Sequence, residues 1–330
     1  MPKPLPPWKP ICRGRSVRAA IAVLICFACL AGEPPGHSGQ QARLSADTLS
    51  VSVDRVNVVF AVLNRKGKLI RNLGRDDFTV FEDDQIQSIS NFSHELDVPL
   101  TIAFLIDSSG SVRDKFRFER QAAAEFFYLT LRSAGDKALL MSFDSSLVVI
   151  ADYTVNPAVL SDAMKKIIPG GSTSLYDAVL EAAAHRLADQ PGRRVIVVLS
   201  DGVDNSSHIS LSRALDSAQK NDVTIYAVST NRIDGGDAED QRTGDAVLKR
   251  LSEETGGSAL FPRRMEDLAH AFSRINEQLR SQYSLAYRPT NIRRDGTYRA
   301  IRIVPAHKGY KVRCRSGYYA PAAPTFRAGN

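Results

Sequence analysis

The chain has 330 residues, which is long enough for two domains of ordinary size. Its composition, with 43% hydrophobic and 24% charged residues, excludes an intrinsically disordered chain. The formal net charge is +7, but five of the 43 Lys and Arg residues lie in the first 18 positions, and the other 38 are nearly balanced by 36 Asp and Glu, which gives no reason to expect binding to nucleic acid.

Residues 1–31 have the pattern of a secretory signal, because basic residues and no acidic ones precede an apolar run from Ala19 to Ala31. The run is shorter than the ~20 residues that a membrane-spanning helix needs. We therefore expect cleavage after Ala31 and an exported protein in the periplasm, at the cell surface or in the medium. Two alternatives remain: an uncleaved anchor or lipidation at Cys29, and the chain would meet a membrane only in these cases. Beyond the signal Cys314 is the only cysteine, so no intrachain disulfide is expected.

The next part of the chain has the pattern of a linker followed by β-strands. Residues 32–45 are rich in Pro, Gly and polar side chains and are expected to be flexible. The segment 46–96 is rich in β-branched residues, with strands expected at 78–81 and 86–92. A Gly-containing turn at 65–68 favours a hairpin with the Val-rich run before it.

A second β segment, residues 283–320, lies at the other end of the chain. Its strands are expected at 283–289, 297–305 and 310–319, and residues 321–330 are expected to be a disordered tail. A β unit of only ~40 to ~50 residues buries little core on its own. We therefore predict that 46–96 and 283–320 pair into one small, all-β, sandwich-like domain.

Between these segments, residues 97–282 alternate strands with helices. Strands are expected at 100–106, 137–143, 147–153, 194–199, 223–229 and 258–261. Helices are expected at 114–132, 157–168, 174–190, 210–221, 245–255 and 265–281, with a loop at 231–243. This alternation predicts an α/β fold with a doubly wound, mostly parallel sheet, inserted between the two β segments.

Three loops of the α/β part carry oxygen ligands. Asp107, Ser109 and Ser111 follow the first strand, Thr173 lies in a Gly-rich loop before a helix, and Asp201 follows a later strand. Ligands of open parallel sheets bind just beyond the carboxyl ends of the strands, so we expect these five side chains to surround one point. Carboxylate and hydroxyl oxygens are the hard ligands that Mg²⁺ or Mn²⁺ prefers. Each loop taken alone is also compatible with an ordinary turn or helix cap.

Together the three loops resemble the von Willebrand factor A (VWA) domain. The matching motifs are D-x-S-x-S at 107–111, a Thr in a Gly-rich loop before L-Y-D-A at 173–178, and a strand ending in S-D-G at 200–202. The resemblance covers 97–281 and implies a metal-ion-dependent adhesion site (MIDAS). It implies that Ser109 and Ser111 bind Mg²⁺ directly, that Thr173 binds directly or through water, and that Asp107 and Asp201 act through water and hydrogen bonds. Asp177, within L-Y-D-A, is interpreted as support for its helix and not as a ligand.

The β segments resemble one subfamily, the VWFA-related domain first described in Acidobacteria. Its D-F-x-V-x-E-D block is matched at 77–83 and its R-x-G-Y-Y ending at 315–319. These two matches lie in the N-terminal and C-terminal β segments.

The resemblance implies a non-catalytic binding or adhesion module that binds a protein partner through an Asp or Glu side chain of that partner. The alternatives are an envelope structural or assembly factor that uses the fold without metal, and a Mg²⁺-dependent, phosphatase-like hydrolase. A phosphatase that forms an aspartyl-phosphate needs a second Asp two positions after Asp107, where this chain has Ser109. Neither a nucleophile elbow nor a phosphate-binding P-loop is present. The six His residues are scattered without an i, i+4 pair, so no zinc site is expected.

Overall fold

The computed structural model describes most of the chain: residues 55–94, 98–113, 115–131, 135–231 and 238–322. The predicted signal and linker, and all but the first two residues of the predicted tail, lie outside the described residues. The described strands form three sheets, one of six strands and two of four. Among the described residues, no helix is long and apolar enough to cross a membrane.

The six-stranded sheet is the centre of the α/β part, and its strand order is β10-β9-β8-β5-β6-β7. Its strands are β5 (Leu100–Asp107), β6 (Lys137–Phe143), β7 (Leu147–Thr154), β8 (Arg193–Ser200), β9 (Val223–Ser229) and β10 (Ala259–Leu260). All neighbouring strands are parallel except β6 and β7, which form an antiparallel hairpin. Every residue of β5 is buried, which explains why its sequence is a continuous apolar run and not an alternating one.

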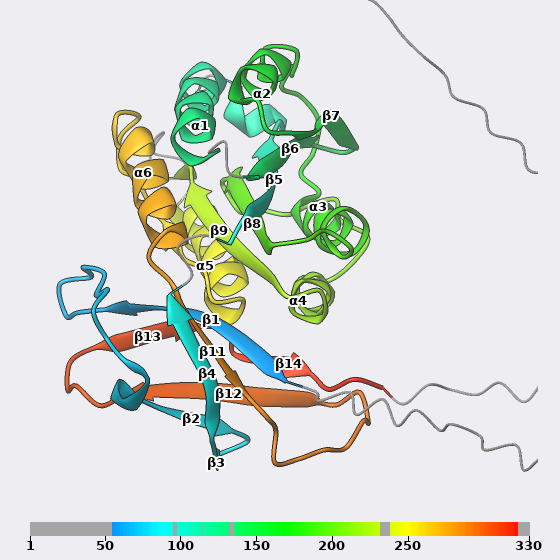
Figure 1. The fold of residues 1–330 in the computed structure, drawn as a ribbon. Coiled ribbons are helices and arrows are strands. Elements are labelled where there is room, and N and C mark those ends of the chain that lie inside the picture. The colour runs from blue at the N-terminus through cyan, green and yellow to red at the C-terminus, as the bar shows by residue number, and fades with distance from the viewer. Residues whose placement is uncertain (1–54, 95–97, 114, 132–134, 232–237, 323–330) are drawn as a thin grey trace, which may run out of the picture. The chain divides into compact units, whose positions relative to one another are not determined.

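Helices cover both faces of this sheet (Figure 1). They are α1 (Phe116–Thr130), α2 (Pro157–Met164), α3 (Leu175–Leu180), α4 (Leu211–Lys220), α5 (Ala238–Glu254) and α6 (Asp267–Leu279), and a π-helical segment, η3 (Glu181–Leu187), continues α3. Helices α1, α2 and α6 pack on the face that carries Ile102, Phe104 and Ile106, whereas α3, α4 and α5 pack on the face of Ala103 and Leu105. The fold is therefore the doubly wound sheet that the alternation of strands and helices predicts.

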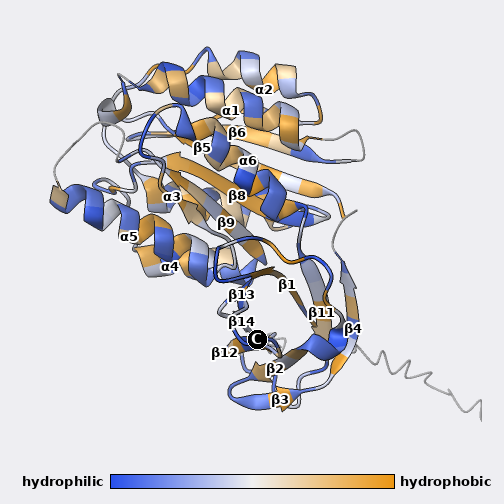
Figure 2. Cartoon of the chain, turned by 90° about the vertical axis from the view of Figure 1, so that its left-hand side faces the viewer, coloured by the Kyte–Doolittle hydropathy of each residue, from blue (hydrophilic) through white to orange (hydrophobic). Residues whose placement is uncertain are grey.

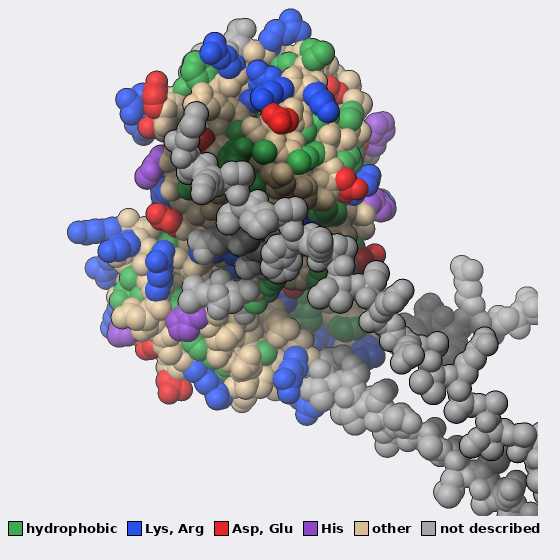
Figure 3. Space-filling model, turned by 45° about the horizontal axis from the view of Figure 1, so that its top comes forward, with side chains coloured by type: hydrophobic (Ala, Val, Ile, Leu, Met, Phe, Trp, Pro, Cys, Tyr) green, Lys and Arg blue, Asp and Glu red, His purple; other side chains and the backbone are tan. Residues whose placement is uncertain are grey.

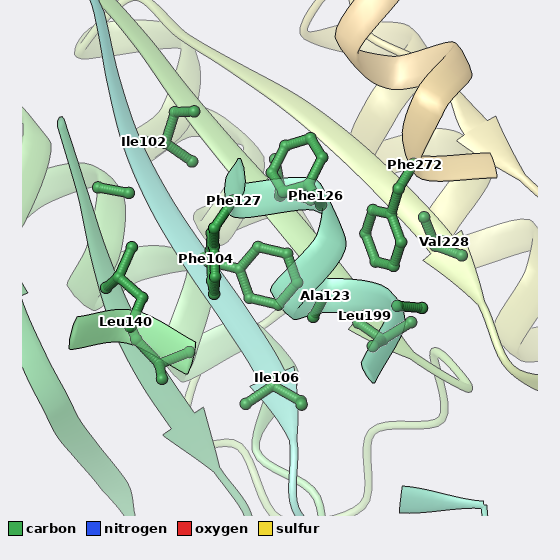
Figure 4. Packing of buried hydrophobic residues seen from close by; sticks show 14 of the residues in the cluster. Ile102, Phe104, Ile106, Ala123, Phe126, Phe127, Leu140, Leu199, Val228 and Phe272 are labelled. Atoms are coloured by element: carbon green, nitrogen blue, oxygen red, sulfur yellow. The ribbon is translucent and has the colours of Figure 1, made fainter. Parts of the chain in front are cut away.

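Aromatic rings fix α1 and α6 to the middle of β5 (Figure 4). The ring centroid of Phe104 lies 5.0 Å from that of Phe127 and 5.9 Å from that of Phe272, and Phe126 lies 5.2 Å from Phe272. All four rings are buried. Figure 2 shows the same organisation at lower magnification, with hydrophobic residues concentrated on β5, β6 and β8. Truncation of one such ring to Ala costs about 3–5 kcal/mol, so this cluster holds the end of β5 in place.

Strands from both ends of the chain form the two four-stranded antiparallel sheets, which confirms the predicted pairing. Their orders are β13-β1-β11-β4 and β14-β12-β2-β3. The strands are β1 (Val56–Leu63), β2 (Phe78–Glu82), β3 (Gln85–Gln87), β4 (Ile89–His94), β11 (Tyr283–Tyr287), β12 (Tyr298–Pro305), β13 (Lys311–Cys314) and β14 (Gly317–Tyr319). Apolar residues of both sheets share one cluster, so together they form a small sandwich.

A buried polar network joins the two sheets of the sandwich. The hydroxyls of Tyr287 and Tyr318 donate to Glu82 Oε2 at 2.8 and 2.9 Å, and Arg299 Nη1 lies 3.5 Å from Glu82 Oε1. Glu82 belongs to the D-F-x-V-x-E-D block and Tyr318 to the R-x-G-Y-Y ending, so the two β motifs of the sequence meet here. A buried charge is tolerated when it is paired and hydrogen-bonded, as Glu82 is.

Three expectations about the β sandwich and its neighbours are wrong in detail. The turn at 65–68 leads only to an isolated bridge between Leu63 and Leu69, and β1 pairs instead with β11 and β13. The strand expected at 86–92 is divided between β3 and β4, and the one expected at 310–319 between β13 and β14. In each divided case the chain passes from one sheet to the other, a change that the local residue pattern does not reveal.

The predicted loop at 231–243 is also corrected in its described part, because α5 already begins at Ala238. The Gly- and Asp-rich composition favoured a loop. Glu239 and Asp240 lie in the first turn of the helix, where acidic side chains interact favourably with the helix dipole. Acidic residues that suggested a loop therefore belong to the start of a helix.

Candidate functional site

The site lies where the central sheet changes the direction of its connections. Strands β5 and β8 are parallel neighbours, and they end at Asp107 and Ser200. The chain continues from β5 to β6 on one side and from β8 to β9 on the other. Such a switch point leaves a crevice at the carboxyl ends of the two strands, where ligands of open α/β sheets bind.

Asp107 is fully buried and fixed by two hydrogen bonds. Its Oδ1 accepts from the backbone N–H of Ser109 at 2.9 Å, and its Oδ2 accepts from the Ser200 hydroxyl at 2.7 Å. Burial, and then the negative charge of Asp201, raise the pKa of Asp107 to about 6, although the two hydrogen bonds oppose the rise. A positive charge in the crevice would relieve both causes.

Two serines connect the Asp107 loop to Asp201. The hydroxyls of Ser109 and Ser111 are 3.0 Å apart, and the Ser111 hydroxyl donates to Asp201 Oδ2 at 2.9 Å. The other oxygen, Asp201 Oδ1, accepts from the backbone N–H of Val203 at 3.0 Å. The structure therefore brings four of the five predicted residues into one hydrogen-bonded network, in which Asp107 is joined to Ser109 through the backbone N–H of that serine.

Thr173 is brought to the same place by its backbone. The Gly170 N–H donates to the Ser108 carbonyl at 2.7 Å, and the Gly110 N–H donates to the Gly171 carbonyl at 3.1 Å. Thr173 itself is buried, and within the described residues no hydrogen bond joins its hydroxyl to the other four side chains. Two backbone hydrogen bonds thus hold its loop against the D-x-S-x-S loop.

Residues outside the sequence motifs hold these loops. Asn205 Oδ1 accepts from the backbone N–H of Thr173 at 2.8 Å, and Asn231 Nδ2 donates to the Asp201 carbonyl at 2.5 Å. Asn231 lies two residues beyond the end of β9, the strand next to β8, so its position after a parallel strand is a signal that could have identified it. Asn205 lies in an irregular loop and gave no comparable signal.

Glycines allow α5 to approach the Asp201 loop closely. Gly202 has φ +80°, and an added Cβ there would lie 2.4 Å from the Gly244 carbonyl oxygen. Reciprocally, a Cβ on Gly244 would lie 2.2 Å from the Asp201 carbonyl oxygen. Contacts this short do not occur with real side chains, so the two glycines are required where the backbones cross.

Asp177 has a structural role beside the site. Its Oδ2 accepts from the backbone N–H of His208 at 3.0 Å and lies 2.8 Å from His208 Nδ1. It therefore connects α3 to the loop before α4, in agreement with its interpretation as support. Among the described residues no group of three or more His, Cys, Asp or Glu side chains is placed to hold a metal, so a cation here would depend on the hydroxyls of Ser109, Ser111 and Thr173.

The donor set fits a small, hard cation. The candidate donors are two carboxylates and three hydroxyls, all of them oxygen ligands suited to Mg²⁺ or Mn²⁺. Burial first, and then the charge of Asp201, raise the pKa of Asp107, so a cation bound beside it would favour its ionised form.

Comparisons with known proteins agree with this geometry. Residues 102–203 match the model of the von Willebrand factor type A domain family. The comparison with curated proteins gave no match.

Several solved structures are similar over part of the chain. The PilB minor pilin from Streptococcus sanguinis is 14% identical with a TM-score of 0.43, over 57% of this chain and 62% of the pilin. Proximal thread matrix protein 1 from the mussel byssus, in a structure with a zinc-occupied MIDAS motif, is 18% identical with a TM-score of 0.48, over 60% of this chain and 50% of that protein. A von Willebrand factor type A protein from Catenulispora acidiphila is 14% identical with a TM-score of 0.44, over 82% of this chain and 74% of that one.

This chain therefore spans less than two thirds of the pilin and of the mussel protein. The evidence for a family lies in the chain itself: the three spaced motifs, the order of the central sheet and the match over residues 102–203. On this evidence the α/β part of the chain has the fold of the von Willebrand factor type A domain.

Proposed function

We propose that this protein is an exported, non-catalytic binding module that holds Mg²⁺ or Mn²⁺ at a MIDAS-type site and uses it to bind an acidic side chain of a protein partner. The observation that carries the proposal is the hydrogen-bonded chain from Asp107 through Ser109 and Ser111 to Asp201. A bound Mg²⁺ keeps exchangeable waters, one of which an incoming carboxylate can replace.

The hydroxyls and the carboxylates of the site have different roles in metal binding. Ser109, Ser111 and Thr173 supply neutral hydroxyl ligands, which leave part of the charge of the cation uncompensated. Asp107 and Asp201 orient the serines and supply negative charge from behind them. This arrangement favours an additional anionic ligand from outside, which is the chemistry of a partner Asp or Glu.

The proposed setting is the cell envelope or the medium. The basic and apolar pattern of residues 1–31 supports export. The two β motifs support membership of the VWFA-related subfamily, since their residues Glu82 and Tyr318 are hydrogen-bonded to each other.

Metal titration tests the proposal. Bound metal is removed from the protein with EDTA, and the protein is dialysed against metal-free buffer. It is then titrated calorimetrically with Mg²⁺ and with Mn²⁺. We expect one-site binding by the wild type and its loss in an Asp107→Asn/Ser109→Ala double variant. A matched control, Asp189→Asn/Ser212→Ala, changes the same residue types at exposed positions away from the crevice and should bind metal like the wild type.

The carboxylate step needs a second measurement. Short peptides with a single Asp or Glu are screened for binding to the Mg²⁺-loaded chain, and binders are tested again after the metal is removed. The proposal requires binding that disappears without metal and in the double variant. A folded wild-type chain that binds neither metal nor acidic peptide would contradict it and favour a structural or assembly role of the fold without metal.

A further inference from the structure

We infer that a second ligand site, for a small oxyanion that carries two or more carboxylate or phosphate groups, lies in a basic cleft between α4 and the β sandwich. The basic cleft has a volume of about 670 Å³ and is lined by residues that include Arg55, Lys220, Arg288, Arg293, Arg315 and Tyr319. This volume falls within the ~300–1,000 Å³ typical of small-molecule sites.

The charge of the basic cleft is strongly one-sided. Seven of its lining residues are Arg or Lys, and Asp222 is the one acidic residue among them. The chain as a whole beyond its first 18 positions is nearly balanced, and on the upper part of the face shown in Figure 3 basic side chains lie among acidic ones. Cations gathered in a concave site repel one another and attract anions, so the cleft focuses a positive potential.

Two of these arginines are structural and form the wall. Arg299 is 3% exposed and pairs with Glu82, and its guanidinium also donates to the carbonyls of Asn291 and Arg293. Arg315 donates to Asp222 Oδ1 and to the Asn57 carbonyl, each at 2.6 Å. Arg299 thus fixes the segment 288–294 to β12, and Arg315 joins β1 to the α/β part, which together give the cleft a fixed shape.

Other cations of the cleft have no such partner. Arg55, Arg288 and Arg293 are exposed, and within the described part of the chain their guanidinium groups form no hydrogen bond or ion pair. An arginine fork matches the geometry of a carboxylate or a phosphate and binds it through two parallel hydrogen bonds. Three unpaired forks around one concave site therefore favour a ligand with more than one oxyanion group.

The cleft also holds a lysine in a defined position. Lys220 Nζ lies 4.7 Å from the centroid of the Tyr319 ring, and the Tyr319 hydroxyl donates to Asp216 Oδ1 at 2.6 Å. The ring orients the ammonium group and leaves its remaining donors to a ligand. The exposed side chain of Ile292 adds an apolar contact at the same cleft.

The basic cleft is separate from the MIDAS-type site. Asp222 and Lys220 precede β9, whereas Asp107 is the last residue of β5 and Asp201 directly follows β8. Because β5, β8 and β9 are parallel, the MIDAS-type site lies at the carboxyl ends of the strands and the basic cleft lies at their amino ends. Binding in the cleft should therefore not need a metal ion.

Calorimetric titration of the full chain with citrate and with pyrophosphate tests the inference. Divalent metals are removed from the buffer because both probes bind them. A chelating resin is used because a soluble chelator is itself an oxyanion and would compete with the probes for the cleft. We expect saturable binding of at least one probe, and its affinity should fall at least tenfold in an Arg288→Ala/Arg293→Ala variant. Preference for citrate assigns a carboxylate ligand, and preference for pyrophosphate assigns a phosphate ligand.

Two controls make the result specific. Lys66→Ala/Lys308→Ala removes the same charge from exposed positions that do not line the cleft, and it should change the affinity less than twofold. The Asp107→Asn/Ser109→Ala variant should retain anion binding, which separates this inference from the proposed function. No saturable binding by the folded wild type, or an equal loss in the cleft variant and the lysine control, would overturn it.

Discussion

A buried carboxylate is the central feature of this molecule at the scale of single residues. Asp107 has no exposed surface, although a charged group is costly to bury. Hydrogen bonds from Ser109 and Ser200 offset part of this cost, but the nearby charge of Asp201 adds to it. The protein therefore tolerates an unfavourable charge at the place where a cation is proposed to bind, as functional sites often do.

This unfavourable charge predicts a pH dependence of the metal-free protein. The pKa of Asp107 is about 6 in the folded state against an ordinary 3.8, so the folded chain binds a proton more tightly than the unfolded chain. The contribution of Asp107 to stability is therefore fully present below about pH 4 and is lost as the pH rises through about 6. The shift corresponds to on the order of 3 kcal/mol.

Urea unfolding of the metal-free chain at pH 4.5 and pH 7.5 measures the effect. The Asp107→Asn variant cannot ionise, so the difference in unfolding free energy between wild type and variant should change between the two pH values. An Asp189→Asn control, at an exposed position, should follow the wild type at both. If wild type and Asp107→Asn show the same pH dependence, the burial of Asp107 has no such consequence.

The sequence identified the ligand candidates better than the residues that hold them. Asp107, Ser109, Ser111 and Asp201 lie in short motifs at the ends of strands, and the structure joins them by hydrogen bonds. Asn205 and Gly244 act on these loops from other parts of the chain. Their roles depend on which loops meet in space, and no local pattern contains that information.

At the scale of elements, the crossing of α5 over the Asp201 loop is a contact that is sensitive to side-chain size. Gly244 lies inside α5, where replacement by Ala in a free helix would stabilise by about 1 kcal/mol. Here an added Cβ would lie 2.2 Å from the Asp201 carbonyl oxygen, which is backbone and cannot rotate away. The clash must therefore displace α5 or the loop.

We predict that Gly244→Ala destabilises the protein by about 1–3 kcal/mol, the usual cost of overpacking, and weakens metal binding as well. Chemical unfolding and metal calorimetry measure the two effects. Thr243→Ala, the adjacent exposed position on the same helix, should be neutral or slightly stabilising. A stabilised Gly244→Ala protein with unchanged metal affinity would show that the two backbones are not in contact as described.

Elements of the α/β part were predictable because their periodicity reflects burial directly. The apolar run of β5 and the spacing of Phe126 and Phe127 in α1 each correspond to a buried face. The sandwich was harder, since β3 and β4 are contiguous in sequence but belong to different sheets. A strand that changes sheets keeps its residue pattern, so its division follows from the tertiary fold alone.

At the scale of the whole molecule, the order of strands makes the two ends of the chain depend on each other. Strand β11 lies between β1 and β4, and β12 lies between β14 and β2. The central sheet contains no strand from either end of the chain. The sandwich therefore closes only when the C-terminal segment has been added, whereas the central sheet has all of its strands before residue 283.

Truncation of the chain tests whether the sandwich needs the C-terminal segment while the central sheet does not. A chain that ends at residue 282 lacks β11 to β14, which leaves β1 and β4 without any strand neighbour and β2 with β3 alone. We predict by hydrogen–deuterium exchange that amides of β1 and β4 then exchange at rates near those of an unfolded chain, while those of β5 and β8 stay protected, because isolated strands are not stable in water. Deletion of residues 323–330 alone removes no described strand and serves as the control. Protection of β1 in the chain that ends at 282 would mean that the N-terminal segment holds its structure by contacts with the α/β part, and the interdependence of the two ends would be wrong.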